Sequence, residues 1–362
     1  MYRIPTPTAD ALDTHYNRYS PAVLQLMERL MAGHQIPVTL GRSKPVTVNI
    51  QVRNDSYTYE FICKYHEEVN LRQLLCGDWQ TLLSIVNEVN DNIPNLYWQQ
   101  DMTKSAYEAH NYTVHGTDGD GHDQIDHFNT ILYWLFVEQM YEGGNGTSPF
   151  QKVQFVKDRK MTVCPYCGRV PIHVSEEPGR RTSAPPIDHF LPKSKYPFLA
   201  MSFYNLIPCC SKCNDIQNKS NFDPILLDPY TERLINPYVF RKDAVSFCYH
   251  LDDTEKLDEK RYLISSEAAN EYLDEGYLSV LKLRSLYSQE HQEVKKLHVK
   301  YTTLTDSCKK YLHALGAENE FLANLPVLVL GYQSDDNEAP RQLYYKFKED
   351  IYSQLCKDYP VF

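Results

Sequence analysis

Long apolar runs, glycine and basic charge are all scarce in this sequence of 362 residues. The longest uncharged apolar stretch, Thr130–Val137, is far shorter than the roughly 18 residues of a membrane-spanning helix, so we expect no membrane span. Only 14 glycines and a hydrophobic content of 42% argue against collagen-like and disordered chains. The first residues, MYRIPTPTAD, lack the features of a signal peptide, so we expect a cytoplasmic protein.

Charge is distributed unevenly along the chain. The sequence has 37 Lys and Arg residues against 47 Asp and Glu residues, and its net charge of −10 disfavours indiscriminate binding to nucleic acids or anionic lipids. Residues 151–220 reverse this balance with 11 basic and 5 acidic side chains. This segment carries +6 and leaves −16 for the rest of the chain, so it is the part most suited to a polyanion.

The ten cysteines fall into two groups. Five of them are isolated in apolar contexts and are interpreted as small buried hydrophobes: Cys63, Cys76, Cys248, Cys308 and Cys356. The other five lie within fifty residues: Cys164, Cys167, Cys209, Cys210 and Cys213. Without a signal peptide, such clustering indicates a metal site rather than disulfides.

Two CxxC motifs frame the central segment. Cys164-Pro-Tyr-Cys167 and Cys210-Ser-Lys-Cys213 each form a tight turn that directs two thiolates to one point, and together they predict a tetrahedral Cys₄ zinc site. Four protein ligands leave no position for a substrate, so the zinc is expected to be structural. Cys209 forms only CxxxC with Cys213 and is interpreted as a non-ligand.

Three further motifs lie within or at the end of this frame. They are PIDHFLP at residues 186–192, NLIP at residues 205–208 and Cys-Asn at residues 213–214. In this order, and together with the first CxxC, they resemble the HNH, or ββα-metal, endonuclease family in its zinc-stapled branch. The resemblance covers about 57 residues and implies a small ββα-metal module.

The resemblance implies a role for each matching residue. His189 matches the general base, and Asp188 matches a carboxylate that binds the catalytic metal. Asn205 matches the asparagine that braces the base, and Asn214 matches the third motif position, which ligates the metal. The chain departs from the common Cys-Asn-x-x-Lys pattern by one residue, which leaves open whether Lys219 or Asn218 contributes.

The chemistry of these side chains is consistent with phosphodiester hydrolysis. An imidazole with an ordinary pKa of about 6.5 can accept a proton near neutral pH. One carboxylate and one amide carbonyl form an oxygen site with open positions, which suits a single Mg²⁺ or Mn²⁺ ion. The alternative is that Asp188 and His189 form an ordinary surface hydrogen bond.

Basic residues of the same segment are candidates for contacts with the phosphate backbone: Arg180, Arg181, Lys193, Lys195, Lys212 and Lys219. The four aromatic residues nearby could stack on bases, but core or surface packing is the favoured interpretation: Tyr196, Phe198, Phe203 and Tyr204. A second Ile-Asp-His, at residues 125–127, lies in the acidic stretch 115–127. That stretch has neither a CxxC nor a calcium-loop pattern and is interpreted as a polar loop before a helix.

Periodicity predicts a mainly α (α+β) protein with helical flanks around the module. One helix is predicted to begin at Ser20-Pro21. Further helices are predicted over Leu71–Val89, Phe128–Met140 and Arg341–Leu355, and two packed helices within Glu267–Leu315. A hairpin is predicted over Val46–Cys63, with a turn at residues 54–56, and a linker at residues 142–149. The expected regions are residues 1–149, 150–240 and 241–362.

The leading hypothesis is a metal-dependent endonuclease that cuts DNA. Proteins of similar layout act in bacterial anti-phage defence, often beside an ATPase, so the resemblance implies such a partner or a homo-oligomer that delivers the acidic chain to DNA. The alternatives are an RNase that uses the same residues and a zinc-stabilised adaptor without catalysis. An adaptor would need neither Asp188, His189 nor Asn214.

Overall fold

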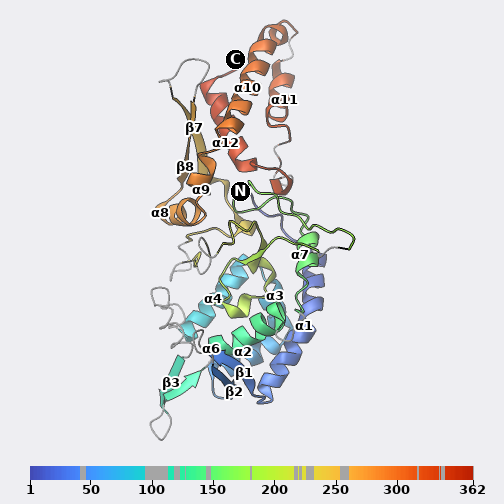
Figure 1. Ribbon diagram of the computed structural model, residues 1–362, viewed down its shortest axis with the longest axis vertical. Helices are drawn as coiled ribbons and strands as arrows, with labels where there is room; N and C mark the ends of the chain where they lie inside the picture. The colour runs from blue at the N-terminus through green and yellow to red at the C-terminus, as the bar shows by residue number, and fades with distance from the viewer. Residues whose placement is uncertain are drawn as a thin grey trace.

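The computed structural model describes residues 1–40, 46–93, 113–117, 123–126, 128–143, 148–179, 182–215, 219, 222–225, 232–252, 261–315, 318–333, 335 and 339–361. In this part of the chain the protein is mainly helical, with two-stranded antiparallel sheets, as the sequence predicted at this level. Figure 1 shows the N-terminal helices at one end of the long axis and the C-terminal hairpin and helices at the other. The cysteine-rich segment lies between them.

The first helix, α1, begins earlier than its sequence signals predicted. It spans Ala9–Met31, and the Thr8 side chain caps it by accepting a hydrogen bond from the Ala11 backbone N–H. Pro21 lies inside the helix rather than at its start. The buried face begins before the proline, at His15, Tyr16 and Tyr19, so its packing outweighs the hydrogen bond that proline removes.

The predicted hairpin at residues 46–63 is wrong in its second strand. β2 (Val46–Ile50) pairs with the preceding β1 (Ile36–Leu40), whereas Tyr57–His66 forms helix α2. Ser56 caps this helix, and the buried residues Phe61, Ile62 and Tyr65 follow a helical spacing. Of the alternating residues that indicated a strand, only Phe61 lies on this buried face, so the cap and the helical spacing of the buried residues decide the conformation.

The helices that follow complete the N-terminal region. The predicted helix Leu71–Val89 is divided at Gly77-Asp78 into α3 (Glu68–Cys76) and α4 (Trp79–Asn92), and Asp78 caps α4. The predicted helix at Phe128–Met140 corresponds to α6 (Phe128–Leu132) and the π-helix η3 (Tyr133–Glu142).

The acidic stretch at residues 115–127 is not simply a loop. Its described parts belong to the hairpin of β3 (Thr113–Thr117) and β4 (Asp123–Asp126). Residues 118–122 and His127 lie outside the described residues. The predicted loop is therefore wrong at the two strands, and a helix does follow at Phe128.

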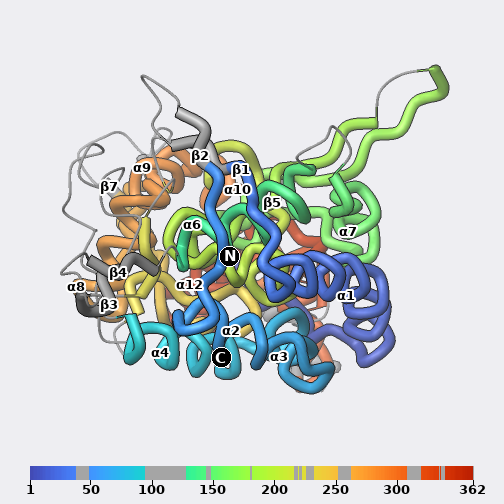
Figure 2. The backbone as a smooth tube through the Cα atoms, turned by 90° about the horizontal axis from the view of Figure 1, so that it is seen from below, coloured from blue at the N-terminus to red at the C-terminus, as the bar shows by residue number. Residues whose placement is uncertain are grey.

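The central segment is built on very short elements. After α7 (Lys152–Asp158), strand β5 (Ile187–His189) pairs antiparallel with β6 (Leu206–Pro208). The 3₁₀ turns η4 (Pro197–Leu199) and η5 (Phe203–Asn205) fill the connection between the strands. The insertion before β5 forms an arm in which Ser175 and Ser183 exchange backbone hydrogen bonds. Figure 2 shows this arm, in light green, extending away from the body.

The C-terminal region contains a hairpin that the sequence analysis missed. β7 (Val245–Asp252) and β8 (Arg261–Ala268) pair over eight residues, and Val245, Phe247 and Tyr249 alternate toward the interior. The hairpin is followed by a series of helical elements: α8 (Glu271–Leu273), η8 (Asp274–Val280), α9 (Leu283–Tyr287), α10 (His291–Leu315), α11 (Glu318–Leu330) and α12 (Tyr345–Asp358). Helix α12 confirms the helix predicted over Arg341–Leu355.

One hydrophobic core runs through all three regions. The Trp79 ring of α4 meets Phe190 just after β5, with ring centres 5.2 Å apart, and Phe61 of α2 packs against Phe198 of η4. The loop between β5 and β6 is thus built into the N-terminal core. Among the described helices, none combines the length and apolar character needed to cross a membrane.

Candidate active site and metal centre

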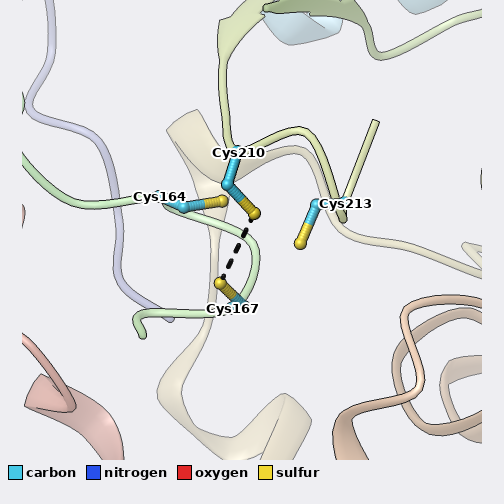
Figure 3. Close-up of side chains that lie close together, drawn as sticks. All are labelled: Cys164, Cys167, Cys210 and Cys213. Carbon is cyan, nitrogen blue, oxygen red and sulfur yellow. Dashed lines mark hydrogen bonds between the residues drawn. The ribbon is translucent and has the colours of Figure 1, made fainter. Parts of the chain in front are cut away.

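Four buried cysteines from the two CxxC motifs converge on one point. The Sγ atoms of Cys164, Cys167, Cys210 and Cys213 all lie within 4.8 Å of one another, and Figure 3 shows two segments of chain contributing two each. The Sγ atoms of Cys167 and Cys210 are 4.0 Å apart. Four thiolates around one zinc ion would be about 3.8 Å apart, whereas a disulfide needs about 2.05 Å. The cluster therefore fits a metal such as zinc.

Backbone hydrogen bonds form each cysteine turn. In the first, the N–H of Gly168 donates to the carbonyl of Cys164 over 2.8 Å, and in the second the N–H of Cys213 donates to Cys210 over 3.1 Å. Gly168 has a φ of +65°, and a Cβ atom there would lie 2.1 Å from the backbone N of Met1. A glycine is therefore required at this position.

The four thiols of the cluster change one another's pKa values. Hydrogen bonds from neighbouring thiols, above all from Cys164, lower the pKa of both Cys167 and Cys210. Burial raises the pKa of Cys164, and hydrogen bonds from the other thiols raise that of Cys213, both well above the usual value. Metal binding requires thiolates, so these two thiols must lose their protons when a metal binds. Within the described residues, no other group of three or more Cys, His, Asp or Glu side chains is close enough to share an ion.

Cys209 is buried and lies outside the cluster. Its backbone N–H donates to Pro186 over 3.0 Å, and burial raises the pKa of its thiol well above the usual value. The pKa values of Cys164 and Cys213 inside the cluster are raised as well, so position rather than pKa distinguishes Cys209 from the ligands. This placement agrees with its interpretation as a non-ligand.

Asp188 lies in the middle of β5, opposite Ile207 of β6. The residue is 6% exposed, and its side-chain contacts with the described residues are made through Oδ2. The Tyr166 hydroxyl donates to this oxygen, and the Lys219 Nζ lies 2.7 Å from it. A buried carboxylate needs such partners, because an isolated charge would be strongly destabilised.

His189 is the last residue of β5 and is 8% exposed. Its Nε2 lies 3.1 Å from the carbonyl oxygen of Ala200. A carbonyl only accepts, so Nε2 carries the proton and Nδ1 keeps its lone pair. Burial, followed by the Lys193 ammonium, lowers the pKa of His189 to about 3, so the imidazole is neutral at pH 7.

Asn205 ties together the loop that follows β5. Its Oδ1 accepts the Leu191 N–H over 2.7 Å, and its Nδ2 donates to the carbonyls of Leu191 and Leu199. The side chain is completely buried. Because Leu199 precedes the residue that holds the His189 ring, Asn205 fixes the position of the imidazole without touching it.

Asn214 is the remaining motif residue among those that the structure describes. Asn214 directly follows the second cysteine turn, is half-buried, and its N–H donates to the Cys210 carbonyl over 3.1 Å. Asn218, Arg180 and Arg181 lie outside the described residues. The catalytic metal pair of Asp188 and Asn214 therefore remains a prediction.

The lysines predicted to contact phosphate lie in different environments. Lys219 is 2% exposed and paired with Asp188, so its predicted role as a surface contact is wrong. Lys195 pairs with the buried Asp223 over 3.5 Å. Lys193 forms a partly exposed pair with Glu142, and Lys212 is exposed.

The four neighbouring aromatic residues are all buried, as their interpretation as packing residues predicted: Tyr196, Phe198, Phe203 and Tyr204.

Sequence reasoning missed three residues that surround the site. Tyr166 lies between the first two cysteines, and its position inside CPYC was the only available signal. Tyr141 of η3 packs its ring against His189, with ring centres 4.5 Å apart. Asp223 accepts the Tyr196 hydroxyl over 2.8 Å. Tyr141 is far from the motifs in sequence and Asp223 follows them without a motif of its own, so only the fold reveals both.

Comparison with known proteins assigns neither a family nor a function to this chain. No protein-family model matches the chain, and neither a curated protein nor a solved structure does.

Proposed function

We propose that this protein is a metal-dependent endonuclease of the HNH type that hydrolyses phosphodiester bonds in DNA. The observation that carries the proposal is a β5–β6 hairpin that joins the cysteine cluster to adjacent Asp188 and His189 side chains. His189 is oriented by a backbone carbonyl, as a general base requires. An adaptor would need the cysteine cluster but no oriented imidazole.

In this proposal, His189 accepts the proton of the attacking water through Nδ1. Nε2 is committed to the Ala200 carbonyl, so Nδ1 is the nitrogen with a free lone pair. A base with a pKa of about 3 would be weak at pH 7. Burial is the main cause of this low pKa and the Lys193 ammonium the second, so the negative charge of a substrate phosphate beside the ring would raise it and strengthen the base.

Asp188 and Asn214 would supply oxygen ligands for Mg²⁺ or Mn²⁺. The fit rests on Asp188, because Tyr166 and Lys219 engage only one oxygen of its carboxylate. A bound divalent cation would stabilise the negative charge that develops on the phosphate and the leaving oxygen. Carboxylate and amide oxygens are the ligands these hard cations prefer.

The described arrangement is a closed one. The Tyr141 ring covers His189, and the neighbouring Glu142 pairs with Lys193 at the same edge. DNA must displace this edge to reach the imidazole. The Glu142–Lys193 pair is partly exposed and therefore weak, so a phosphate could compete for the lysine. The −16 charge outside residues 151–220 supports delivery by a partner protein or a second copy.

The test is cleavage by the full-length protein and by His189→Ala. Plasmid DNA, linear DNA and RNA are each incubated with Mg²⁺, Mn²⁺ or EDTA. We expect DNA cleavage that requires the divalent cation. His189→Ala should lower the rate about 10²- to 10⁴-fold, the usual contribution of a general base. Zinc content and DNA affinity should stay at the parent level.

His173→Ala is the matched control, because His173 is an exposed histidine of the same segment. It should cleave like the parent. Cleavage by His189→Ala at the parent rate would refute the mechanism. Cleavage of RNA alone would favour the RNase, and DNA binding without cleavage under any metal condition would favour the adaptor.

A further inference from the structure

The Asp188 carboxylate is held by only one of its two oxygens. Both the Tyr166 hydroxyl and the Lys219 ammonium contact Oδ2. Among the described residues, no hydrogen bond reaches Oδ1. Asp188 is 6% exposed and Lys219 is 2% exposed, so water screens this arrangement little.

Lys219 is a fixed counter-charge rather than a mobile side chain. In addition to Asp188, its Nζ lies 3.3 Å from the carbonyl oxygen of His189 and 3.1 Å from that of Phe190. Three acceptors from consecutive residues therefore match the three N–H donors of the ammonium. The lysine is locked to β5 and the residue that follows it.

Tyr166 reaches Asp188 from the cysteine cluster. It lies between Cys164 and Cys167, both in the four-thiol group, so a metal bound there also fixes the tyrosine backbone. Its own side chain is 1% exposed. Through this hydroxyl, a residue of the first cysteine turn holds the Asp188 carboxylate.

Two donors on one oxygen restrict rotation of the carboxylate and leave the other oxygen in a defined direction. Groups that hydrogen-bond a metal ligand typically change metal affinity or activity about 10- to 100-fold when they are removed. We propose that Tyr166 is a positioning residue, which holds Asp188 through Oδ2 and presents Oδ1 to a divalent cation. This inference rests on the proposed function and extends it to the cysteine turn.

The decisive variant is Tyr166→Phe, because it removes the hydroxyl without changing charge or ring size. Lys219 is less informative, since removing its charge would also remove its repulsion of a cation. Binding of Mn²⁺ to the zinc-loaded full-length protein is measured by titration calorimetry and by the electron paramagnetic resonance signal of free Mn²⁺. We expect Tyr166→Phe to bind Mn²⁺ at least tenfold more weakly, with one zinc per chain retained.

Tyr287→Phe is the matched control. Its hydroxyl also contacts the first cysteine turn, donating to the Cys167 carbonyl over 2.5 Å, but no contact with Asp188 is described. It should bind Mn²⁺ within twofold of the parent. Raising the Mn²⁺ concentration should restore cleavage by Tyr166→Phe toward the parent rate, whereas Asp188→Asn should stay inactive.

The outcomes separate this inference from the proposed function. If Asp188→Asn loses Mn²⁺ binding but Tyr166→Phe and Tyr287→Phe both bind like the parent, Tyr166 has no positioning role and the endonuclease proposal stands. If both tyrosine variants weaken binding equally, the effect is general loosening of the turn, which also overturns the inference. If Asp188→Asn binds Mn²⁺ as the parent does, the metal role of Asp188 is wrong and both proposals fail.

Discussion

Lysine side chains of one short segment have three different environments, which sequence alone could not distinguish. Lys193 is 30% exposed and pairs with the exposed Glu142. Lys195 is 13% exposed and faces an Asp223 side chain that is 1% exposed, and Lys219 is buried against Asp188. Solvent screens only the first pair well, so Lys193 alone is free to exchange its partner for a phosphate.

Lys193→Ala should therefore affect mainly the salt dependence of DNA binding, and Lys195→Ala mainly the free energy of unfolding. Lys193→Ala should change the free energy of unfolding by about 0 to 1 kcal/mol, because an exposed pair is worth little. It should lower the salt dependence of DNA binding by about one phosphate contact, a change of about 0.9 in the slope of log K against log salt. Urea unfolding and binding titrations from low to high salt measure the two quantities.

Lys195→Ala should instead lower the free energy of unfolding by about 3 kcal/mol, because it removes the ammonium that pairs with the buried Asp223. Its salt slope should match the parent slope. An unchanged stability for Lys195→Ala, or an unchanged slope for Lys193→Ala, would contradict this division.

Because of the buried His15, we expect the free energy of unfolding to fall in acid. His15 is 4% exposed, and its Nε2 donates to the Met201 carbonyl over 2.8 Å. Burial lowers the pKa of His15 to about 3, against about 6.5 in the unfolded chain. Between these values the unfolded state binds one more proton than the folded state, so stability is lost as the pH falls below about 6.5.

Each such histidine contributes a slope of about 1.4 kcal/mol per pH unit in this window. His15→Gln should lower the measured slope of unfolding free energy against pH by that amount between about pH 4 and 6. The buried His189 should leave a second contribution in place. His173→Ala, an exposed control, should keep the parent slope, and an equal slope in His15→Gln would refute the assignment to His15.

At the residue scale, spacing predicted the cysteine cluster but not the carboxylate partners. Two CxxC motifs constrain four thiols locally, and the structure brings all four together. The partners of Asp188 are Tyr166 and Lys219, and nothing in the sequence separates a buried lysine from a surface one. Burial depends on the packing of distant segments, which a local pattern does not contain.

At the element scale, a helix cap outweighed an alternating pattern at one point in the chain. The aromatic alternation at residues 57–63 predicted a strand, yet the Ser56 cap and the buried Phe61, Ile62 and Tyr65 form α2. The hairpin of β7 and β8 was missed, although Val245, Phe247 and Tyr249 alternate toward the interior. Short elements offer few residues on which a period can be measured, so neighbours decide their conformation.

We expect the two cysteine turns to act as one element only when a metal joins them, which gives a direct test. Cys210→Ser removes a ligand and should reduce zinc below one per chain and unfold the segment. The zinc contribution of about 10 to 16 kcal/mol in zinc-finger peptides matches or exceeds the whole stability of a typical domain. Elemental analysis and thermal unfolding measure both effects.

Cys209→Ser is the neighbouring control, because Cys209 is buried beside the cluster without belonging to it. It should retain one zinc per chain and lose only a few degrees of thermal stability. Equal zinc content in Cys210→Ser and the parent would contradict the four-thiol site. Loss of zinc in Cys209→Ser would show that the cluster is assigned to the wrong thiols.

At the scale of the whole molecule, contacts cross both of the region boundaries expected from the sequence. The Ser202 hydroxyl donates to Leu74 of α3 over 2.5 Å, and Asn129 of α6 donates to the Ser194 carbonyl over 3.2 Å. On the other side, Tyr287 donates to Cys167, and the Tyr344 N–H donates to Gly168 over 2.6 Å. The N-terminal region thus supports the loop between the β-strands, and the C-terminal region supports the first cysteine turn.

These contacts predict that residues 150–240 do not form a stable domain alone. Excision exposes Phe190 and Phe198, both fully buried in the whole chain, and burial of one such ring contributes about 1.5 to 3 kcal/mol. Losing both, together with the hydrogen bonds at the two boundaries, removes much of a domain stability of about 5 to 15 kcal/mol.

We expect the excised segment to bind zinc but to show weak near-ultraviolet circular dichroism and no cooperative thermal transition. The full chain should unfold in one transition that coincides with zinc release, because its regions share a core. Cooperative unfolding of the segment at the temperature of the full chain would show that the cysteine turns and the β5–β6 hairpin are self-sufficient. In that case the closed edge formed by Tyr141 and Glu142 would be a separable cover rather than part of the fold.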